Sequence, residues 1–468
     1  MDKLSQIVSQ YILEVRFEDL GPTVIASAKR STLDTIGAML AGSSASGIDT
    51  VVDLAKGWGG AEEACVVGFG SRVPAPVAAW CNGAMARARE IDDCLDFLPV
   101  HPSASTVPAL LALAEWKGSM SGRDFLTGLA VGQDLTIRMG LSLRRNGLQS
   151  GRNNMFRIFG STAALAKAMG SEAEEVRNAL GVAFSFAVGD GQSALDGALT
   201  LRLQQGIAAQ GAVLSMLLAS RGFTGAHDFL LGKFGYFRAF EPNPRVEYLT
   251  KDLGKSFYGD QISIKPYSAC RAAHSAINLA LRIRSEEHVD PRSITRVVVR
   301  TCPEVYRLVG SPRYAKIKPA SPAVAQFSIQ FGVAAAFIRG DFFLDELEPH
   351  VIRDEAILDL ARRVYVKSEP SLRTDSVLGR TIMEVEFAGV PSVMKEILWP
   401  LGNPSHPIAS RACEEKFRKC ARYSVSSLET GRLNDLIAMI SQLEDLSDVS
   451  AISPLLCSQG HGGGERRQ

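Results

Sequence analysis

The stretch Gly259-Asp-Gln-Ile-Ser-Ile-Lys-Pro-Tyr-Ser-Ala-Cys-Arg-Ala-Ala-His274 marks a change in the texture of the chain. Before it, between residues 3 and 219, apolar side chains recur at the spacing of amphipathic helices. Alanine and glycine recur on these segments, and small side chains let helices approach one another closely. After it, short segments of β-branched and alternating side chains are typical of strands. The sequence therefore predicts a compact helical domain that is followed by a mixed α+β unit.

Strands are predicted in the second part at residues 261–264, 293–301, 363–367, 381–387 and 390–398. Helical spacing intervenes at residues 274–284, 323–339 and 357–364. Ala388-Gly389, between the last two strands, predicts a hairpin turn. Pro391 indicates that the last strand lies at an edge of its sheet, because proline cannot donate a ladder hydrogen bond.

Proline and glycine then interrupt the pattern between residues 400 and 407, and helical periodicity returns at residues 410–421 and 428–440. We therefore expect the chain to rejoin its first domain. The predicted fold class is mostly α with an α+β part. The large all-helical domain is built from both chain ends, residues 1–260 and 402–455, and a smaller α+β lid domain, residues 261–401, is inserted between them. Residues 456–468 are predicted to form a flexible tail.

Composition excludes several classes of function. The chain has 468 residues, of which 46% are hydrophobic and 22% charged, and its formal net charge is +1. This balance gives no overall attraction to nucleic acid or to an anionic membrane surface, and no basic stripe with interleaved aromatic residues is present. The longest apolar runs are too short to span a bilayer, and the acidic residues among positions 1–20 are not typical of a signal peptide. We expect no nucleic-acid partner and no membrane association.

The eight cysteines are scattered, and no C-x-x-C pair or zinc-type spacing occurs among them. In a long chain without a secretion signal, free buried thiols are expected in preference to disulfides. The sequence thus predicts a cytoplasmic protein without a metal site.

The stretch that opens the second part also carries chemistry. Lys265, Tyr267, Arg271 and His274 gather cationic and polar donors where one element ends and another begins, which suggests that an anionic ligand is bound there. Buried lysine changes its pKa readily and can serve as a base. The planar fork of Arg271 suits a carboxylate, although an interdomain salt bridge is an equal alternative. His274 shares a helical face with Arg271, and its alternative role is that of a structural histidine.

Four blocks of the chain together resemble the MmgE/PrpD family, which includes 2-methylcitrate dehydratase, cis-aconitate decarboxylase and iminodisuccinate epimerase. The blocks are Leu33-Asp34-Thr35-Ile36-Gly37 with Leu40-Ala41-Gly42; Asn82-Gly83 with Asp92-Asp93 and His101-Pro102-Ser103; Lys265 to His274; and Gly402-Asn403-Pro404 with Pro407 and Lys416-Phe417. The resemblance implies a helical domain made from both chain ends, with an α+β lid. It also implies a homodimer that uses no metal or organic cofactor and acts on small di- or tricarboxylates.

The same resemblance points to catalytic residues. His101 resembles the family's catalytic histidine, and Lys265 its lysine, as a substrate anchor or a proton carrier. Asp92 and Asp93 belong to the acidic active-site block, and neighbouring carboxylates can raise one pKa and so make an acid or a base. Equally, an aspartate beside a polar loop can cap a helix or remain solvated. Tyr267, Arg271 and His274 are predicted to bind substrate.

The chain departs from the family pattern at several polar positions. Arg87 stands where the family often has histidine, and Asn153 and Asn154 occupy the region of a second expected histidine. Leu201 replaces an expected lysine, and Phe331 an expected tyrosine, which removes a proton-donating hydroxyl.

Three hypotheses remain at this stage. The first is a cofactor-independent lyase most like 2-methylcitrate dehydratase, of the hydro-lyase or decarboxylase type, which abstracts a proton next to a carboxylate of a small di- or tricarboxylate in a cleft between the two domains. The second is an isomerase or epimerase of a small carboxylate, which needs no acid for a leaving group. The third is a catalytically drifted, carboxylate-binding member of the family.

Overall fold

The computed structural model describes residues 2–144, 151–152, 154–376 and 378–457. Their chain folds into two compact units. The first takes its residues from 1–93, 100–260 and 410–468, and the second from 94–99 and 261–409. The predicted fold class, mostly α with an α+β part, is confirmed. Of the predicted tail, residues 458–468 lie outside the described residues.

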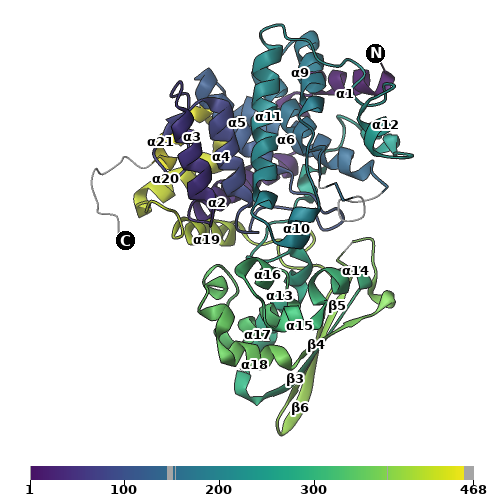
Figure 1. Cartoon of the computed structure of the whole chain (residues 1–468), viewed down its shortest axis with the longest axis vertical. Helices are drawn as coiled ribbons and strands as arrows, with labels where there is room; N and C mark the ends of the chain where they lie inside the picture. Colours follow the sequence, from purple (N-terminus) through teal and green to yellow (C-terminus); the bar gives the residue numbers. More distant parts are fainter. Residues whose placement is uncertain (1, 145–150, 153, 377, 458–468) are drawn as a thin grey trace. The chain divides into compact units, whose positions relative to one another are not determined.

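Helices dominate the first unit (Figure 1). They are α1 (Lys3–Glu14), α2 (Pro22–Ser43), α3 (Ile48–Trp58), α4 (Ala75–Arg87), α5 (Ser103–Lys117), α6 (Gly122–Leu141), α8 (Arg157–Met169), α9 (Ala173–Ser185), α10 (Gln192–Asp196), α11 (Thr200–Ala219), α12 (Tyr236–Phe240), α19 (Ser410–Ala421), α20 (Thr430–Ser441) and α21 (Ser453–Leu456). Two short antiparallel strands, β1 (Ala64–Cys65) and β2 (Arg72–Val73), precede α4.

Small residues set the distances between these helices. A Cβ atom at Gly42 of α2 would lie 1.9 Å from the backbone oxygen of Met85 in α4. One at Gly83 of α4 would lie 2.8 Å from the Cα of Gly206 in α11. Both crossings therefore require glycine, as the small-residue pattern predicted. They fix α4, whose last residue, Arg87, contacts Asp92 and is followed by the loop that carries the candidate site.

The second unit is built on a four-stranded sheet with the order β4-β3-β5-β6. Its strands are β3 (Ile294–Thr301), β4 (Val364–Ser368), β5 (Thr381–Phe387) and β6 (Val390–Ile397). β3 pairs in parallel with β4, whereas the other neighbours are antiparallel. The predicted hairpin is confirmed, since Gly389 has a φ of 78° and Pro391 lies in the edge strand β6.

Helices of this unit pack on the sheet and on one another: α13 (His274–Glu286), α14 (Pro303–Val305), α15 (Arg313–Ile317), α16 (Pro322–Gln326), α17 (Ile329–Arg339) and α18 (Glu355–Arg362). α13 contacts β5 and β6, and α17 and α18 contact β4 (Figure 1). The single helix predicted at 323–339 is wrong, because the chain breaks at Phe327 and restarts where the Ser328 hydroxyl accepts from the backbone N–H of Phe331 at 3.0 Å.

The strand predicted at residues 261–264 is also wrong. Only Ser263 pairs, in an isolated antiparallel bridge to Cys94, with N···O distances of 2.8 and 3.1 Å. This bridge places residues 94–99 in the second unit, although the sequence assigned them to the helical domain. Ile264 then donates its N–H to the carbonyl of Gly402 at 3.0 Å, and residues 402–409 belong to the second unit as well. Pairing between segments distant in sequence decides both boundaries.

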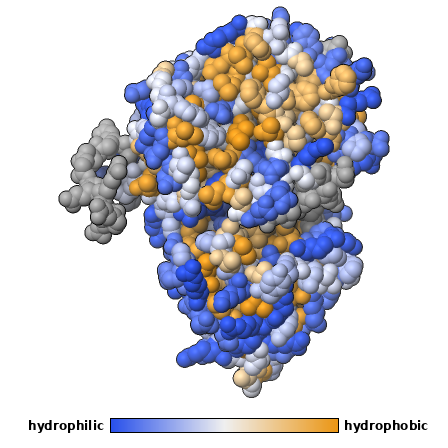
Figure 2. All heavy atoms as spheres, in the orientation of Figure 1, coloured by the Kyte–Doolittle hydropathy of each residue, from blue (hydrophilic) through white to orange (hydrophobic). Residues whose placement is uncertain are grey.

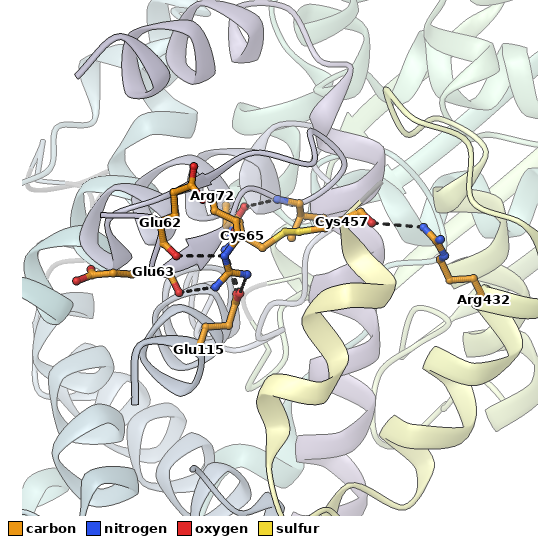
Figure 3. Close-up of a disulfide and its surroundings, with 9 residues drawn as sticks. Glu62, Glu63, Cys65, Arg72, Glu115, Arg432 and Cys457 are labelled. Atoms are coloured by element: carbon orange, nitrogen blue, oxygen red, sulfur yellow. Dashed lines mark hydrogen bonds and ion pairs between the residues drawn. A yellow bond between two sulfur atoms is a disulfide. The ribbon is translucent and has the colours of Figure 1, made fainter. Parts of the chain in front are cut away.

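One pair of cysteines contradicts the expectation of free thiols. Cys65 of β1 and Cys457, which follows α21, form a disulfide with a Cα–Cα distance of 6.4 Å (Figure 3). The backbone N–H of Cys65 donates to the Glu115 carboxylate, which also pairs with Arg72 at 2.8 Å. Leu456 and Cys457 are thus ordered residues and not part of a flexible tail. Disulfides persist in oxidising compartments and are rare in the cytosol, so this bond is evidence against the predicted cytoplasmic location. The compartment itself stays a prediction.

We expect the purified, denatured and unreduced protein to titrate six thiols, one for each free cysteine, because Cys65 and Cys457 are bonded. The bond closes a span of 392 residues, and its reduction is expected to cost about 2–5 kcal/mol of the free energy of unfolding. A Cys65→Ala/Cys457→Ala variant should be insensitive to reductant in a thermal melt. Eight titrating thiols in the wild-type protein would show that the bond is absent.

No helix in the described part of the chain combines the length and the apolar character needed to cross a membrane.

Candidate active site

The loop between α4 and α5 carries the acidic block of the first unit. Asp92, Asp93 and His101 lie in contact there, so three of the predicted catalytic residues are brought together. α5 begins at Ser103 after Pro102, which offers no side-chain cap. The Asp93 carboxylate, ten residues earlier in the chain, caps the helix instead, because its Oδ1 accepts from the backbone N–H of Ser103 at 3.3 Å. The local sequence therefore folds the acidic pair back onto the start of α5.

His101 faces both aspartates through one ring nitrogen. Its Nδ1 lies 2.9 Å from Asp92 Oδ2 and 2.8 Å from the backbone oxygen of Asp93. Because both neighbours are acceptors, the neutral ring carries its proton on Nδ1, and Nε2 is the nitrogen that accepts a proton. The side chain of His101 is 16% exposed, whereas that of Asp92 is completely buried. The arrangement is that of a proton-transferring histidine oriented by a carboxylate.

Arg87, at the end of α4, holds the other side of Asp92. Its guanidinium lies 3.1 Å from Asp92 Oδ1 and 2.5 Å from Glu90 Oε1, and the side chains of Arg87 and Glu90 are each only 9% exposed. Glu90 adopts a φ of 55°, in the left-handed region, which turns its side chain back to Arg87. Sequence reasoning missed Glu90, although its i,i+3 spacing from Arg87 is a recognisable signal. The departure at Arg87 thus supplies a permanent cation to Asp92.

Asp93 has a different environment from Asp92. Its Oδ2 accepts from the Ser103 hydroxyl, which in turn accepts from Gln133 Nε2 at 2.8 Å. Burial raises the pKa of Asp93 to about 7; the Ser103 hydroxyl opposes this rise, and the negative charges of Asp34 and Asp92 add to it. Gln133, from α6, was not predicted from the sequence. Asp93 therefore anchors α5 and titrates near neutrality, while Asp92 orients His101.

The raised pKa of Asp93 predicts a pH-dependent stability. Its value is 3.8 in the unfolded chain and about 7 in the folded one, so the native state binds the extra proton between these limits and loses stability as the pH rises through them. Relative to the wild-type protein, Asp93→Asn should gain about 2 kcal/mol in the free energy of unfolding between pH 5.5 and 7. Denaturant titrations at both pH values measure this change.

The matched control is Asp290→Asn, at an exposed position where the hydrogen bond from Arg292 lowers the pKa of the carboxyl. Its stability difference from the wild-type protein should be the same at pH 5.5 and 7. Parallel pH dependence in Asp93→Asn and the wild-type protein would contradict the assignment of Asp93.

The second unit buries all four residues predicted in the Lys265–His274 block; Lys265 is 1% exposed. Arg271 binds Asp96 through two hydrogen bonds, Nε–Oδ1 at 2.7 Å and Nη2–Oδ2 at 2.9 Å. Asn403 donates to the same carboxylate at 2.7 Å, and Arg271 Nη1 donates to the Leu401 carbonyl at 2.8 Å. The guanidinium of Arg271 is thus engaged by groups of its own unit.

His274 and Tyr267 contact each other within this block, with ring centroids 5.2 Å apart. His274 Nε2 lies 3.1 Å from the Ala269 carbonyl, and Asn278 Nδ2 donates to the Tyr267 hydroxyl at 3.0 Å. Burial raises the pKa of Tyr267 to about 12, so its hydroxyl stays protonated near neutrality. The polar atoms of both rings therefore have partners that fix the shape of the block, and substrate binding by these two residues stays a prediction.

The remaining departures from the family pattern differ in their surroundings. Asn153 lies outside the described residues, and the carbonyl of Asn154 accepts from Arg157 Nε at 2.8 Å. Leu201 is half-buried on α11. Phe331 is completely buried and packs edge-on against Phe342 at a centroid distance of 6.3 Å, so it belongs to the core of the second unit.

Across residues 2–144, 151–152, 154–376 and 378–457, no three or more His, Cys, Asp or Glu side chains are grouped so as to hold a metal ion.

Comparison with known families identifies the family of the chain. The sequence matches the MmgE/PrpD N-terminal domain over residues 6–249 and the MmgE/PrpD C-terminal domain over residues 267–442. The chain therefore belongs to the MmgE/PrpD family, and the resemblance inferred from the sequence is confirmed.

Its curated relatives are similar over nearly their whole length. The chain is 26% identical to the cis-aconitate decarboxylase-like protein oryM of Aspergillus oryzae, over 96% of each chain. It is 24% identical to the cis-aconitate decarboxylase of Aspergillus terreus, over 94% of this chain and 93% of the relative. The human cis-aconitate decarboxylase is 26% identical, over 92% and 90%. These relatives place the chain among lyases that process carboxylates.

Proposed function

We propose that this protein is a cofactor-independent lyase that moves a proton at a carbon next to a carboxylate of a small di- or tricarboxylate. The observation that carries the proposal is the contact of His101 Nδ1 with Asp92, at 2.9 Å, in a partly exposed acid–base centre. Relatives named as cis-aconitate decarboxylases support the substrate class.

The proposed roles follow from the geometry of each residue. In a dehydration, His101 Nε2 takes a proton from the carbon next to the carboxylate, the C–O bond on the adjacent carbon breaks, and the hydroxyl takes the proton from the imidazolium and leaves as water. In a decarboxylation, the bond to the carboxylate breaks, carbon dioxide leaves, and the imidazolium gives its proton to the carbon that held it. Asp92 orients the ring and stabilises the imidazolium, and Arg87 holds Asp92. Lys265 is proposed to bind a substrate carboxylate, with Tyr267, Arg271 and His274 shaping the block that carries it.

The first experiment is a turnover assay with the purified protein. It is incubated with cis-aconitate, methylcitrate and related acids, and loss of substrate, release of carbon dioxide and formation of unsaturated product are followed. We expect loss of carbon dioxide or water from at least one tricarboxylate. Deuterium uptake from heavy water without either loss would favour the isomerase instead, and no turnover with any of these acids would sink the lyase proposal.

We also propose that the protein acts as a homodimer. Several side chains of α11 are apolar and incompletely buried: Leu203, Ile207, Leu214, Leu217 and Leu218. Trp58 and Leu54 of α3 are 56% and 49% exposed. Arg202, near the start of α11, donates to the carbonyl of Ser46, which lies just before α3. Figure 2 shows hydrophobic side chains gathered over this part of the helical unit. A patch of this kind is typical of a protein interface.

Sedimentation of the wild-type protein should give twice the mass of the chain, and Leu214→Glu should shift it to the monomer. Met394→Glu, at an exposed apolar position of β6, serves as the control and should leave the mass unchanged. A monomeric wild-type protein would refute the dimer.

A further inference from the structure

Lys416 of α19 brings a buried cation to the loop that carries Asp92. Its ammonium donates to Asp34 Oδ1 of α2 and, at 2.7 Å, to the carbonyl oxygen of Ile91. The side chains of Lys416 and Asp34 are 7% and 4% exposed. The Ile91 carbonyl belongs to the peptide bond that joins Ile91 to Asp92. The cation therefore fixes the orientation of the peptide plane from which Asp92 projects.

The helix that carries Lys416 is seated firmly. Phe417 packs against Gly37 of α2, where an added Cβ would lie 3.3 Å from the phenyl ring. Ile91 itself is completely buried. A lysine that is withdrawn from water loses hydration, and its two acceptors compensate for this loss only while they are held in place. The lysine, the aspartate and the Ile91 carbonyl thus form one rigid connection between the chain's C-terminal return and the acidic loop.

The surroundings of the acidic pair include all of these charges. Asp93 is faced by Ser103 of α5, by Asp92 on its own loop and by Asp34 of α2. On the other side of Asp92 stand His101 and Arg87. Lys416 offsets the charge of Asp34, so the pair adds a fixed dipole to the centre rather than a net charge.

We propose that Lys416 and Asp34 are positioning residues of the acid–base centre: they hold the Ile91 carbonyl and so keep Asp92 in line with His101 Nδ1. The role in catalysis rests on the function proposed above, whereas the role in orienting His101 does not. Ile91 directly precedes Asp92 in the sequence, and Asp92 Oδ2 lies 2.9 Å from His101 Nδ1. The effect of removing them reaches the imidazole through the peptide that bears Asp92.

The main test compares Lys416→Met and the double variant Asp34→Asn/Lys416→Met with the wild-type protein. The double variant removes both charges, so it avoids leaving Asp34 as a buried charge without its cation if the single variant folds poorly. The matched control is Lys29→Met/Glu444→Gln, which removes an ion pair that also joins α2 to the C-terminal part of the chain, but with its lysine on the Ser441 carbonyl.

The readout that a merely structural role would not change is the tautomer of His101. The protein has seven histidines, so selective ¹⁵N labelling gives few imidazole signals, and a His101→Gln variant assigns the relevant one. We expect the wild-type ring to carry its proton on Nδ1. Both test variants should show a mixture of tautomers, because the loop that is released at Ile91 carries both acceptors near Nδ1, the Asp92 carboxylate and the Asp93 carbonyl. The control should match the wild-type protein.

Turnover gives the second readout. We expect kcat to fall about 10-fold in the test variants with KM changed less than about 2-fold, because displaced catalytic groups lower the rate of a bound substrate. Unchanged His101 signals in folded test variants would overturn the positioning role. A wild-type protein without turnover would instead refute the proposed function, and the tautomer measurement would still decide the inference about Lys416 and Asp34.

Discussion

Replacing His101 with alanine is expected to lower kcat by about 10²–10⁴-fold, the range over which a positioned general acid or base contributes to a rate. Asp92 Oδ2 and the backbone oxygen of Asp93 hold the ring at Nδ1, and so they orient Nε2, the nitrogen that accepts a proton. Replacing the side chain with a methyl group removes this oriented Nε2. The side chain is largely buried, but no carboxylate loses its only cation, because Arg87 remains beside Asp92. The variant should therefore stay folded, and steady-state kinetics on the substrate found in the turnover assay measures the effect.

Asp92→Asn is expected to cost less than His101→Ala. The backbone oxygen of Asp93 still accepts from Nδ1 at 2.8 Å and keeps the ring in the same tautomer, but the carboxylate that stabilises the imidazolium is gone. His227→Ala removes an exposed histidine of the same unit and should leave kcat unchanged. If His101→Ala retains wild-type kcat, His101 is not the proton carrier, and another residue must move the proton.

The candidate residues of the acidic loop were predictable from the sequence because the resemblance to the family pointed to them and they lie close together in the chain. Asp92, Asp93 and His101 fall within one loop, and the start of α5 after Pro102 gives that loop a fixed end. Local spacing also predicted the hairpin at Gly389, where a positive φ is needed. Local features such as this turn depend on residues that are neighbours in the chain, and a single sequence shows these residues directly.

Partners from distant segments could not be predicted in the same way. Asp96 and Arg271 are 175 residues apart, and Lys416 and Ile91 are 325 residues apart. Nothing in the local sequence of Arg271 distinguishes a guanidinium that binds substrate from one that binds a carboxylate of its own unit, since both need the same planar fork. The disulfide between Cys65 and Cys457 escaped prediction for a related reason, because spacing alone indicates no pairing among scattered cysteines.

The buried pair of Arg271 and Asp96 should give the largest stability effect in the second unit. Arg271→Ala or Asp96→Ala alone leaves the other charge buried, and each is expected to lower the free energy of unfolding by about 3–5 kcal/mol. Arg271→Ala/Asp96→Ala removes both charges and should cost less than the sum of the single changes. Denaturant and thermal unfolding of the four proteins measure the coupling.

The control for this pair is Arg300→Ala, which removes ion pairs with Glu384 and Glu369. The side chain of Arg300 is 25% exposed, and those of Glu384 and Glu369 are 29% and 36% exposed. This variant should cost less than about 1 kcal/mol, because water screens charges that are not buried. The same variants separate the two roles considered for Arg271. If Arg271 binds substrate, its replacement should raise KM and leave the free energy of unfolding nearly unchanged. If Arg271 holds its own unit together, its replacement should lower the free energy of unfolding. Because both oxygens of Asp96 already engage the guanidinium, at 2.7 and 2.9 Å, we expect the second result.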